Sequence, residues 1–233
     1  MGFSAAVFGA SFASADTVLL VGKTNSAITG TLDFNYNSAT TTITIVLENT
    51  TSTTNAEFTG LAFNLPAGSS VTSVGGNADG NKNDTPPSSL SASSDPGNIS
   101  EAWFLLYHTD NIKTPQSVGK FDVGPSGGSG GNFITGGGSG FSIDPGETTT
   151  FSIGLVGTGL GSLTTSDFLS AMSVGGDPPA NFVVRAQSTG ANKEDSDVLT
   201  GTIVPTPTAL IGSLAMLGLF GAGTCRRPYR ANP

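Results

Sequence analysis

The segment TLDFNYNSATTTITIVLE, residues 31–48, decides which fold class is to be expected. Apolar and polar residues alternate in it over two runs, and Asn37-Ser38 separates the runs. The apolar positions are Leu32, Phe34 and Tyr36, followed by Ile43, Ile45 and Leu47. Because successive side chains of a β-strand point to opposite faces, this pattern predicts two antiparallel strands with one buried and one wet face.

The alternating pattern recurs over residues 24–203, with Gly, Pro and Asn between the runs. A third run, Leu61, Phe63 and Leu65, ends at Pro66-Ala67-Gly68. Further strands are expected near residues 100–108, 120–123, 148–155 and 181–187. About eight short strands with turn residues between them predict an all-β fold, an antiparallel β-sandwich or jelly roll.

Two segments interrupt the strand pattern. One short helix is expected over Thr164–Met172, where Thr165 or Ser166 can cap the start. The apolar residues that would share one face of this helix are Phe168, Leu169 and Met172. The tract GPSGGSGGNFITGGGSG, residues 124–140, is of low complexity and is expected to be a flexible surface loop.

The composition narrows the range of partners. Charged residues make up 11% of the 233 residues, well below the roughly 25% of ordinary soluble domains. Nine basic residues oppose seventeen acidic ones, and three of the nine, Arg226, Arg227 and Arg230, lie in the last eight residues. The rest of the chain has many more acidic than basic residues and would repel the phosphate backbone of a nucleic acid. No nucleic-acid partner is therefore expected. The single Cys225 excludes an intrachain disulfide framework.

The first fifteen residues, MGFSAAVFGASFASA, are apolar or small. Within them Ala13-Ser14-Ala15 matches the A-x-A pattern that precedes signal-peptide cleavage. The pattern predicts the back half of a secretory signal peptide that is removed before Asp16, and the missing basic region places the true start upstream. The alternative is an apolar first strand.

Residues 208–225 carry no charged side chain, and a run of this length lies at the short limit for a membrane helix, about 17–25 residues. Pro207 suits the first position of a helix, because its missing N–H would be unpaired there anyway. Arg226 and Arg227 follow directly, and a basic flank stays on the cytoplasmic side. This pattern predicts a membrane tether with the body of the protein outside the cell. The alternative is a buried C-terminal helix.

This ending resembles the PEP-CTERM sorting signal of many Gram-negative bacteria, which has a Val-Pro-Glu-Pro motif, a hydrophobic helix and a basic cluster. The motif positions here are Val204, Pro205, Thr206 and Pro207. Thr206 stands where the family has Glu, and a VPTP-type variant with its own sorting enzyme would account for this difference. Residues 144–190 also resemble the distal half of many PEP-CTERM ectodomains. The resemblance implies recognition by an exosortase, a membrane protease-transpeptidase, and export alongside extracellular polysaccharide.

These segments divide the chain into three expected parts: a signal peptide (residues 1–15), an extracellular β-sandwich domain (16–203) and a sorting signal (204–233). The expected course is export, a precursor tethered to the inner membrane, and then residence at the cell surface or in the extracellular matrix.

Catalytic motifs are weak. Residues 124–128, GPSGG, fit G-x-S-x-G, but a catalytic Ser needs a strand–turn–helix elbow and a His that follows it in the chain. The single His108 precedes the Ser and is expected near a strand end. No two of the seventeen acidic residues stand out as the carboxylate pair of a glycosidase. We therefore expect no enzyme activity and assign no catalytic residue.

One loop offers the alternating amide and carboxylate oxygens that Ca²⁺ prefers. Its candidate ligands are Asn77, Asp79, Asn81 and Asp84. It lacks the bidentate Glu of an EF-hand, and a metal-free loop of Asx turns is the alternative. A second acidic group is expected to be a solvated loop rather than a ligand set: Glu194, Asp195 and Asp197. No other cofactor is expected.

In EAWFLLYHTD, residues 101–110, Trp103 and Tyr107 share one face of an expected strand. That face is either a platform on which a glycan stacks or part of the core. Two hypotheses of function remain. The first is a non-enzymatic surface or matrix protein, and the second is a secreted carbohydrate-binding module or carbohydrate-active enzyme with the same sorting tail.

Overall fold

The computed structural model describes residues 16–52, 55–74, 91–94, 103–127, 142–189 and 195–204. Within these ranges the chain forms eleven strands and one α-helix, so the prediction of an all-β fold is confirmed. The strands are β1 (Asp16–Gly22), β2 (Thr29–Asn37), β3 (Thr42–Asn49), β4 (Glu57–Phe63), β5 (Ser70–Val74), β6 (Ser91–Ser94), β7 (Trp103–Lys113), β8 (Lys120–Gly127), β9 (Thr148–Thr158), β10 (Phe182–Gln187) and β11 (Ser196–Val204). Helix α1 covers Thr165–Ser170, and two short 3-10 turns cover Pro115–Ser117 and Leu160–Ser162.

The segment that predicts the fold class forms the hairpin β2–β3. Its buried apolar residues face one another in pairs: Leu32 with Leu47, Phe34 with Ile45, and Tyr36 with Ile43. At the turn, the side-chain oxygen of Asn37 accepts hydrogen bonds from the backbone N–H groups of Ala39 (3.0 Å) and Thr40 (3.3 Å). An Asx turn of this kind ends a strand. The predicted break at Asn37-Ser38 is therefore confirmed.

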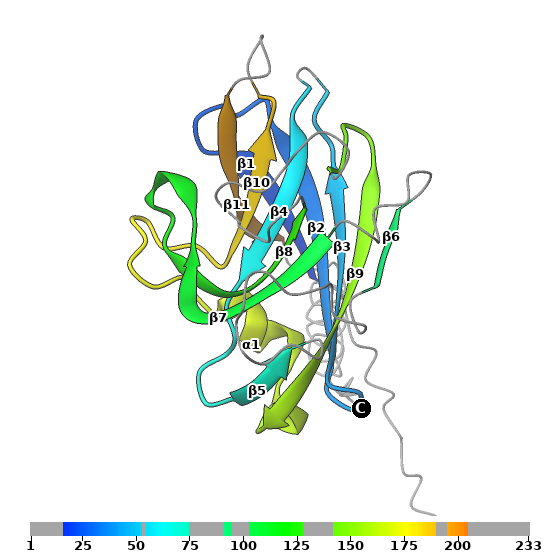
Figure 1. Cartoon of the computed structure of the whole chain (residues 1–233), viewed down its shortest axis with the longest axis vertical. Coiled ribbons are helices and arrows are strands. Elements are labelled where there is room, and N and C mark those ends of the chain that lie inside the picture. Colours follow the sequence, from blue (N-terminus) through cyan, green and yellow to red (C-terminus); the bar gives the residue numbers. More distant parts are fainter. Residues whose placement is uncertain are drawn as a thin grey trace, which may run out of the picture.

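The described strands pair in antiparallel fashion in one sheet. Their order is β5-β9-β3-β2-β1-β11-β10-β4-β8-β7, and β6 pairs with β9 (Figure 1). The strand pattern read from the sequence begins at Thr24, whereas β1 begins at Asp16 and lies in the middle of the sheet. That starting point was wrong because β1 is apolar on both faces: Val18 and Leu20 are buried, and Leu19 and Val21 are exposed.

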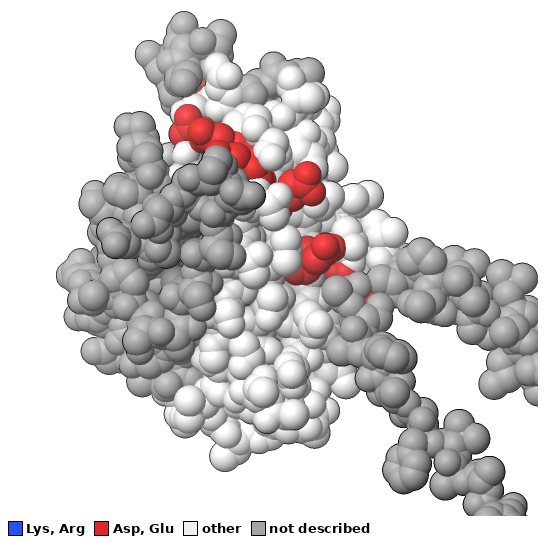
Figure 2. Space-filling model, turned by 90° about the vertical axis from the view of Figure 1, so that its right-hand side faces the viewer, with Lys and Arg blue, Asp and Glu red and all other residues white. Residues whose placement is uncertain are grey.

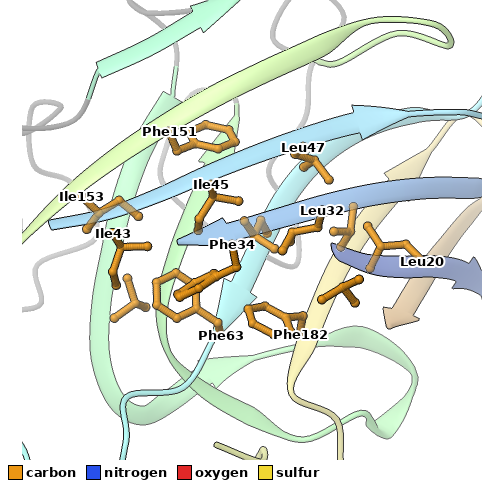
Figure 3. Packing of buried hydrophobic residues seen from close by; sticks show 14 of the residues in the cluster. Leu20, Leu32, Phe34, Ile43, Ile45, Leu47, Phe63, Phe151, Ile153 and Phe182 are labelled. Atoms are coloured by element: carbon orange, nitrogen blue, oxygen red, sulfur yellow. The ribbon is translucent and has the colours of Figure 1, made fainter. Parts of the chain in front are cut away.

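The core lies inside the curl of the sheet. Phe34 on β2 and Phe182 on β10 have ring centroids 5.4 Å apart, although the two strands are three steps apart in the sheet order. Neighbouring strands are spaced by about 4.8 Å, so a flat sheet would separate these rings by about 14 Å. The sheet must curl so that its inner face packs on itself, and Figure 3 shows side chains of β2, β3, β9, β4 and β10 meeting there.

A second, smaller cluster lies on the opposite face of β10. Phe182 and Val184 belong to the main core, whereas Val183 joins the second cluster. The members of this second cluster are Ala62, Ile112, Val118, Phe121, Ala180, Val183 and Val198. Ile112 of β7 and Phe121 of β8 therefore pack on this second face, whereas Leu105 and Val123 of the same hairpin belong to the main core. On that face of β10, Arg185 is buried, and burial lowers the pKa of its guanidinium group.

The predicted short helix is present, but its cap differs from the expected one. α1 begins after Thr164, whose backbone N–H and hydroxyl each donate a hydrogen bond of 2.7 Å to Oδ2 of Asp167, as in a capping box. The cap is therefore Thr164, and the expectation of Thr165 or Ser166 was wrong by one or two residues. Thr165 has another role, because its Oγ1 accepts the backbone N–H of Tyr36 at 3.0 Å.

The apolar face of α1 is shorter than predicted. Phe168 and Leu169 are buried in the main core, but Met172 is 45% exposed. The helix ends at Ser170, and Ala171 has an extended backbone, which turns the chain away from the helical spacing. The expectation that Met172 shares the buried face was therefore wrong.

The glycine-rich tract begins inside the sheet. Gly124–Gly127 are the last residues of β8 and are buried. A Cβ on Gly124 would lie 2.8 Å from the backbone carbonyl oxygen of Leu61, so β8 can approach β4 only where a side chain is missing. The predicted surface loop is wrong for residues 124–127, and residues 128–140 lie outside the described part of the chain.

Candidate functional site

A pocket of about 440 Å³ lies where the chain leaves β4. Its lining comes from residues 64–71, which form the connection after β4 and the start of β5, and from strands β7 and β8. Two residues that follow α1, Met172 and Val174, complete it. Small-molecule sites in proteins occupy about 300–1,000 Å³, so the pocket has the size of a ligand site. We refer to it as the Asn64 pocket.

Asn64 is the least satisfied polar residue of this pocket. Its side chain is only 3% exposed. Neither Nδ2 nor Oδ1 has a hydrogen-bond partner among the described residues. A buried carboxamide without partners costs about 1–3 kcal/mol, and most buried polar side chains do have partners. The unpaired carboxamide of Asn64 therefore makes this pocket the candidate site.

Asp122 and Tyr107 are held beside Asn64 by hydrogen bonds to the backbone. The N–H of Leu65 donates to Oδ2 of Asp122 at 3.0 Å, and Asp122 is itself buried. The hydroxyl of Tyr107 donates to the carbonyl oxygen of Val71 at 2.8 Å. Its half-buried ring packs against the main core. Because these bonds tie β7, β8 and the 64–71 connection together, the polar wall of the pocket is preorganised.

The apolar rim of the pocket, formed by Met172 and Val174, is also held by hydrogen bonds. Met172 and Val174 are 45% and 50% exposed. Between them, Ser173 is buried, and its hydroxyl donates to the carbonyl oxygen of Val118 at 2.7 Å. The backbone N–H of Lys120 donates to the carbonyl oxygen of Val174 at 3.0 Å. These bonds hold two exposed apolar side chains at the edge of a polar pocket.

The described lining combines polar and apolar side chains. Among the described residues that line the pocket, Asp122 is the only carboxylic acid, whereas glycoside hydrolysis typically uses two facing carboxylates. The pocket instead combines a carboxamide, a carboxylate and an aromatic ring with an apolar rim. A few placed polar groups among apolar ones can fix the orientation of a small ligand.

Sequence reasoning missed Asn64 and Asp122. The run Leu61-Ala62-Phe63-Asn64-Leu65 alternates, which predicts that Asn64 faces water. β4 ends at Phe63, however, and Asn64 is buried. That prediction was wrong because the other lining segments cover this position. No signal in the sequence links Asn64 to Asp122, since they meet only through the pairing of β4 with β8.

The predicted processing sites flank the described domain. Val204 is the last residue of β11 and pairs with Thr17 of β1. The other predicted residues of these sites lie outside the described residues: Ala13, Ala15, Pro205, Thr206, Pro207, Arg226 and Arg227. The expected membrane helix, residues 208–225, also lies outside them. Within the part of the chain that the structure describes, no helix has the length and apolar character to cross a bilayer.

The calcium candidates, Asn77, Asp79, Asn81 and Asp84, likewise lie outside the described residues. Among the side chains that are described, no three His, Cys, Asp or Glu residues are grouped so as to hold a metal ion. Calcium binding by the loop therefore stays a prediction.

The aromatic row and the Ser motif both fall in the hairpin β7–β8. Tyr107 lines the Asn64 pocket, and the backbone of Trp103 pairs with Gly127. The backbone of His108 lies within β7 and not near its end. Ser126 is buried in β8, and its surroundings are those of a strand, not of a strand–turn–helix elbow.

Asp197 belongs to the second acidic group, which the sequence predicts to be a solvated loop. Its side chain is 0% exposed and accepts hydrogen bonds from the backbone N–H groups of Asn25 (2.8 Å), Thr24 (3.2 Å) and Val198 (2.8 Å). The carboxylate therefore holds the connection between β1 and β2 against β11. The expectation of a solvated loop was wrong for Asp197, although Asp195 is exposed.

The face of the molecule on the side of β9 and β6 is acidic. Seen from the side on which β9 and β6 lie in Figure 1, several Asp and Glu side chains are visible, and no Lys or Arg is visible among the described atoms (Figure 2). Elsewhere on the strands, carboxylates accept hydrogen bonds from hydroxyl groups, as in the bonds from Thr31 to Glu48 (3.2 Å) and from Thr17 to Asp33 (2.6 Å). Such a face repels polyanions and favours neutral or cationic partners.

Comparisons of the chain with protein-family models, with curated proteins and with solved structures show no match.

Proposed function

We propose that this chain is an exported, non-enzymatic protein of the bacterial cell surface or extracellular matrix, processed at its C-terminus by an exosortase-type membrane enzyme. The supporting observation is the pairing of Thr17 with Val204 in the neighbouring strands β1 and β11. β1 begins at Asp16, directly after the predicted signal-peptide cleavage pattern. β11 ends at Val204, the first residue of the VPTP motif. The described sheet thus follows the first predicted processing segment directly and reaches the first residue of the second.

This pairing has a consequence for the precursor. Because β1 and β11 are antiparallel, the start of β1 and the end of β11 lie at the same end of the sheet. A signal peptide before Asp16 and a membrane helix after Pro207 would both leave the domain there. This end of the domain would then face the membrane. Removal of residues 1–15 would leave β1 whole, whereas removal of residues 204–233 would take only Val204, the last residue of β11, from the described sheet.

The curled antiparallel sheet supports an assignment to the β-sandwich or jelly-roll class, whose members include many surface and lectin domains. Extracellular polysaccharide is the proposed environment of the mature protein. The acidic face in Figure 2 favours a neutral polysaccharide over an acidic one, because like charges repel. Contact with the membrane is proposed only through the tail, before processing.

Intact mass of the exported protein tests the proposal, because it reports both processing sites. The full chain is expressed in a Gram-negative host with and without an exosortase-type enzyme. With the enzyme, the exported form should begin at Asp16 and lack Arg226 and Arg227. Without it, the membrane fraction should retain both arginines. A soluble protein that keeps its complete tail in either host would contradict the proposal.

Variants of the tail separate its two expected roles. The double change Pro205→Ala and Pro207→Ala should leave an unprocessed precursor in the membrane, because a residue before Pro avoids the α region and stays extended for the enzyme. Replacement of Arg226 and Arg227 by Gln should weaken retention, since each Arg costs about 2.5–3.5 kcal/mol at the bilayer centre. Thr208→Ala, just beyond the motif, is the control and should be processed normally.

A further inference from the structure

We propose that the Asn64 pocket binds a neutral polyhydroxylated ligand, and that its occupant is a pyranose sugar unit. This inference does not depend on the sorting proposal, because it rests on the described domain alone. It starts from the buried carboxamide of Asn64, which lines a pocket of about 440 Å³ and has no partner for either polar atom among the described residues.

The chemistry of the carboxamide selects the ligand. Nδ2 has two N–H groups to donate, and Oδ1 accepts, so a partner must both accept and donate at adjacent positions. Neighbouring hydroxyl groups of a sugar do both. A bare cation could bind Oδ1 but would leave the N–H groups of Asn64 unpaired. An anion could accept from Nδ2 but would meet the carboxylate of Asp122 in the same pocket.

Asp122 and Tyr107 extend this match. Oδ2 of Asp122 accepts the N–H of Leu65 at 3.0 Å, which orients the carboxylate beside Asn64. A carboxylate oxygen is a suitable acceptor for a ligand hydroxyl. The half-buried ring of Tyr107 offers an apolar surface, on which the C–H face of a pyranose can pack.

The rim completes the site. Met172 and Val174 are both about half-exposed and border the pocket. Apolar side chains at the mouth of a polar pocket gain contacts when a ligand with C–H groups enters, and Met adapts its shape readily. The hydroxyls of the sugar would then face Asn64 and Asp122, and its carbon face would lie against the rim.

Titration with sugars tests the site directly. The probes are five neutral monosaccharides (glucose, galactose, mannose, xylose and rhamnose), with inorganic phosphate and Ca²⁺ as competing chemistries. The full chain is kept in a zwitterionic detergent without a sugar headgroup, and the side-chain amide signals are followed by ¹H–¹⁵N NMR. We expect at least one sugar to shift the Asn64 signals saturably, with a Kd in about the millimolar range.

Asn64→Leu is the decisive variant, because Leu has nearly the shape of Asn without its polar atoms. We expect at least a tenfold loss of sugar affinity together with a rise in Tm of about 2–4 °C, since the variant removes an unpaired buried amide. Thr59→Val is the matched control: Thr59 also buries an unpartnered hydroxyl, but it does not line the pocket. This control should keep full sugar affinity.

Met172→Ala keeps the test valid if Asn64→Leu fails to fold, because Met172 is exposed and its truncation leaves the core intact. It should weaken sugar binding several-fold without changing Tm. The proposal is overturned if none of the sugars shifts the Asn64 signals, if phosphate or Ca²⁺ shifts them instead, or if Asn64→Leu or Met172→Ala binds like the unchanged protein.

Discussion

Phe34 on β2 and Phe63 on β4 pack edge to face, with ring centroids 5.7 Å apart and ring planes at 76°. Three strands, β1, β11 and β10, lie between β2 and β4 in the sheet order. In a flat sheet four steps of about 4.8 Å would separate these rings by about 19 Å. The contact therefore shows that the sheet curls strongly. Phe34 packs against residues of strands on both sides of this curl.

Truncation of Phe34 should be among the most destabilising single changes. Phe34→Ala removes ring contacts to Phe63, Phe168 and Phe182 and leaves a cavity, so we expect a loss of about 3–5 kcal/mol of unfolding free energy. Chemical denaturation measures this loss. Leu19→Ala, at an exposed position of β1, is the control and should change stability by less than about 0.5 kcal/mol. Equal effects of the two changes would show that the curl is not held by Phe34.

Loss of β1 should abolish cooperative folding. β1 pairs with β2 on one side and β11 on the other, so its removal leaves both neighbours without a partner in the middle of the sheet. A fragment of residues 24–204 should therefore show no cooperative thermal transition by circular dichroism, whereas a fragment of residues 16–204 should melt in one step. A cooperative melt of the shorter fragment would contradict the described order of strands.

Asp197→Ala should loosen the connection between β1 and β2. The change removes a buried acceptor and leaves the N–H groups of Thr24 and Asn25 without it, so we expect a loss of about 3 kcal/mol. Hydrogen exchange at these two N–H groups should accelerate with it. Asp195→Asn changes the charge at an exposed neighbour and should leave both measurements unaltered.

The cap of α1 makes a small pH-dependent contribution. The pKa of Asp167 lies below its ordinary value, first because the hydroxyl of Thr164 donates to its carboxylate and second because the backbone N–H of Thr164 does so. A lowered folded pKa stabilises the protein above the unfolded pKa, and this stability is lost as the pH falls through the folded pKa. Thr164→Ala should raise the pKa of Asp167 and cost about 1 kcal/mol near neutral pH. An NMR titration of the Asp167 carboxyl group checks the shift, and an unchanged pKa would contradict the cap.

Gly124 and Gly154 should respond oppositely to substitution. A Cβ on Gly124 would lie 2.8 Å from a backbone oxygen of β4, so Gly124→Ala must push the strands apart and should cost about 1–3 kcal/mol. A Cβ on Gly154, in β9, would meet no atom within 4 Å, and Gly154→Ala should be neutral or slightly stabilising. Thermal melts of the two variants measure the difference.

Residues 128–138 belong to the tract for which the sequence predicts a loop. Their deletion should leave Tm nearly unchanged, because each doubling of loop length costs only about 0.6 kcal/mol.

Several features could be predicted because they depend on neighbours along the chain. The alternation of Leu32, Phe34 and Tyr36 predicts a strand and its buried face, and Asn37 predicts where that strand ends. The apolar spacing predicts α1 to within two residues. These predictions succeed because the side-chain period of a strand and the hydrogen bonds of a turn are local properties of the backbone.

Other features could not be predicted, because they depend on residues distant in the sequence. Asn64 reads as a water-facing position and Asp197 as part of a solvated loop, yet both are buried. The pocket likewise joins Asn64 to Asp122 only because β8 pairs with β4 and the residues after α1 close over them.

The sequence by itself determined that this chain is built from antiparallel strands and where most of them lie, and it predicts a processing signal in each end segment. Only the tertiary structure decided the order of the strands, the curl that brings Phe34 to Phe63, and the burial of Asn64. The physical reason is that alternation states which face of a strand is apolar but not which strand will cover it. That choice follows from packing the whole sheet around one core, and it sets both the burial and the hydrogen-bond partners of each polar residue.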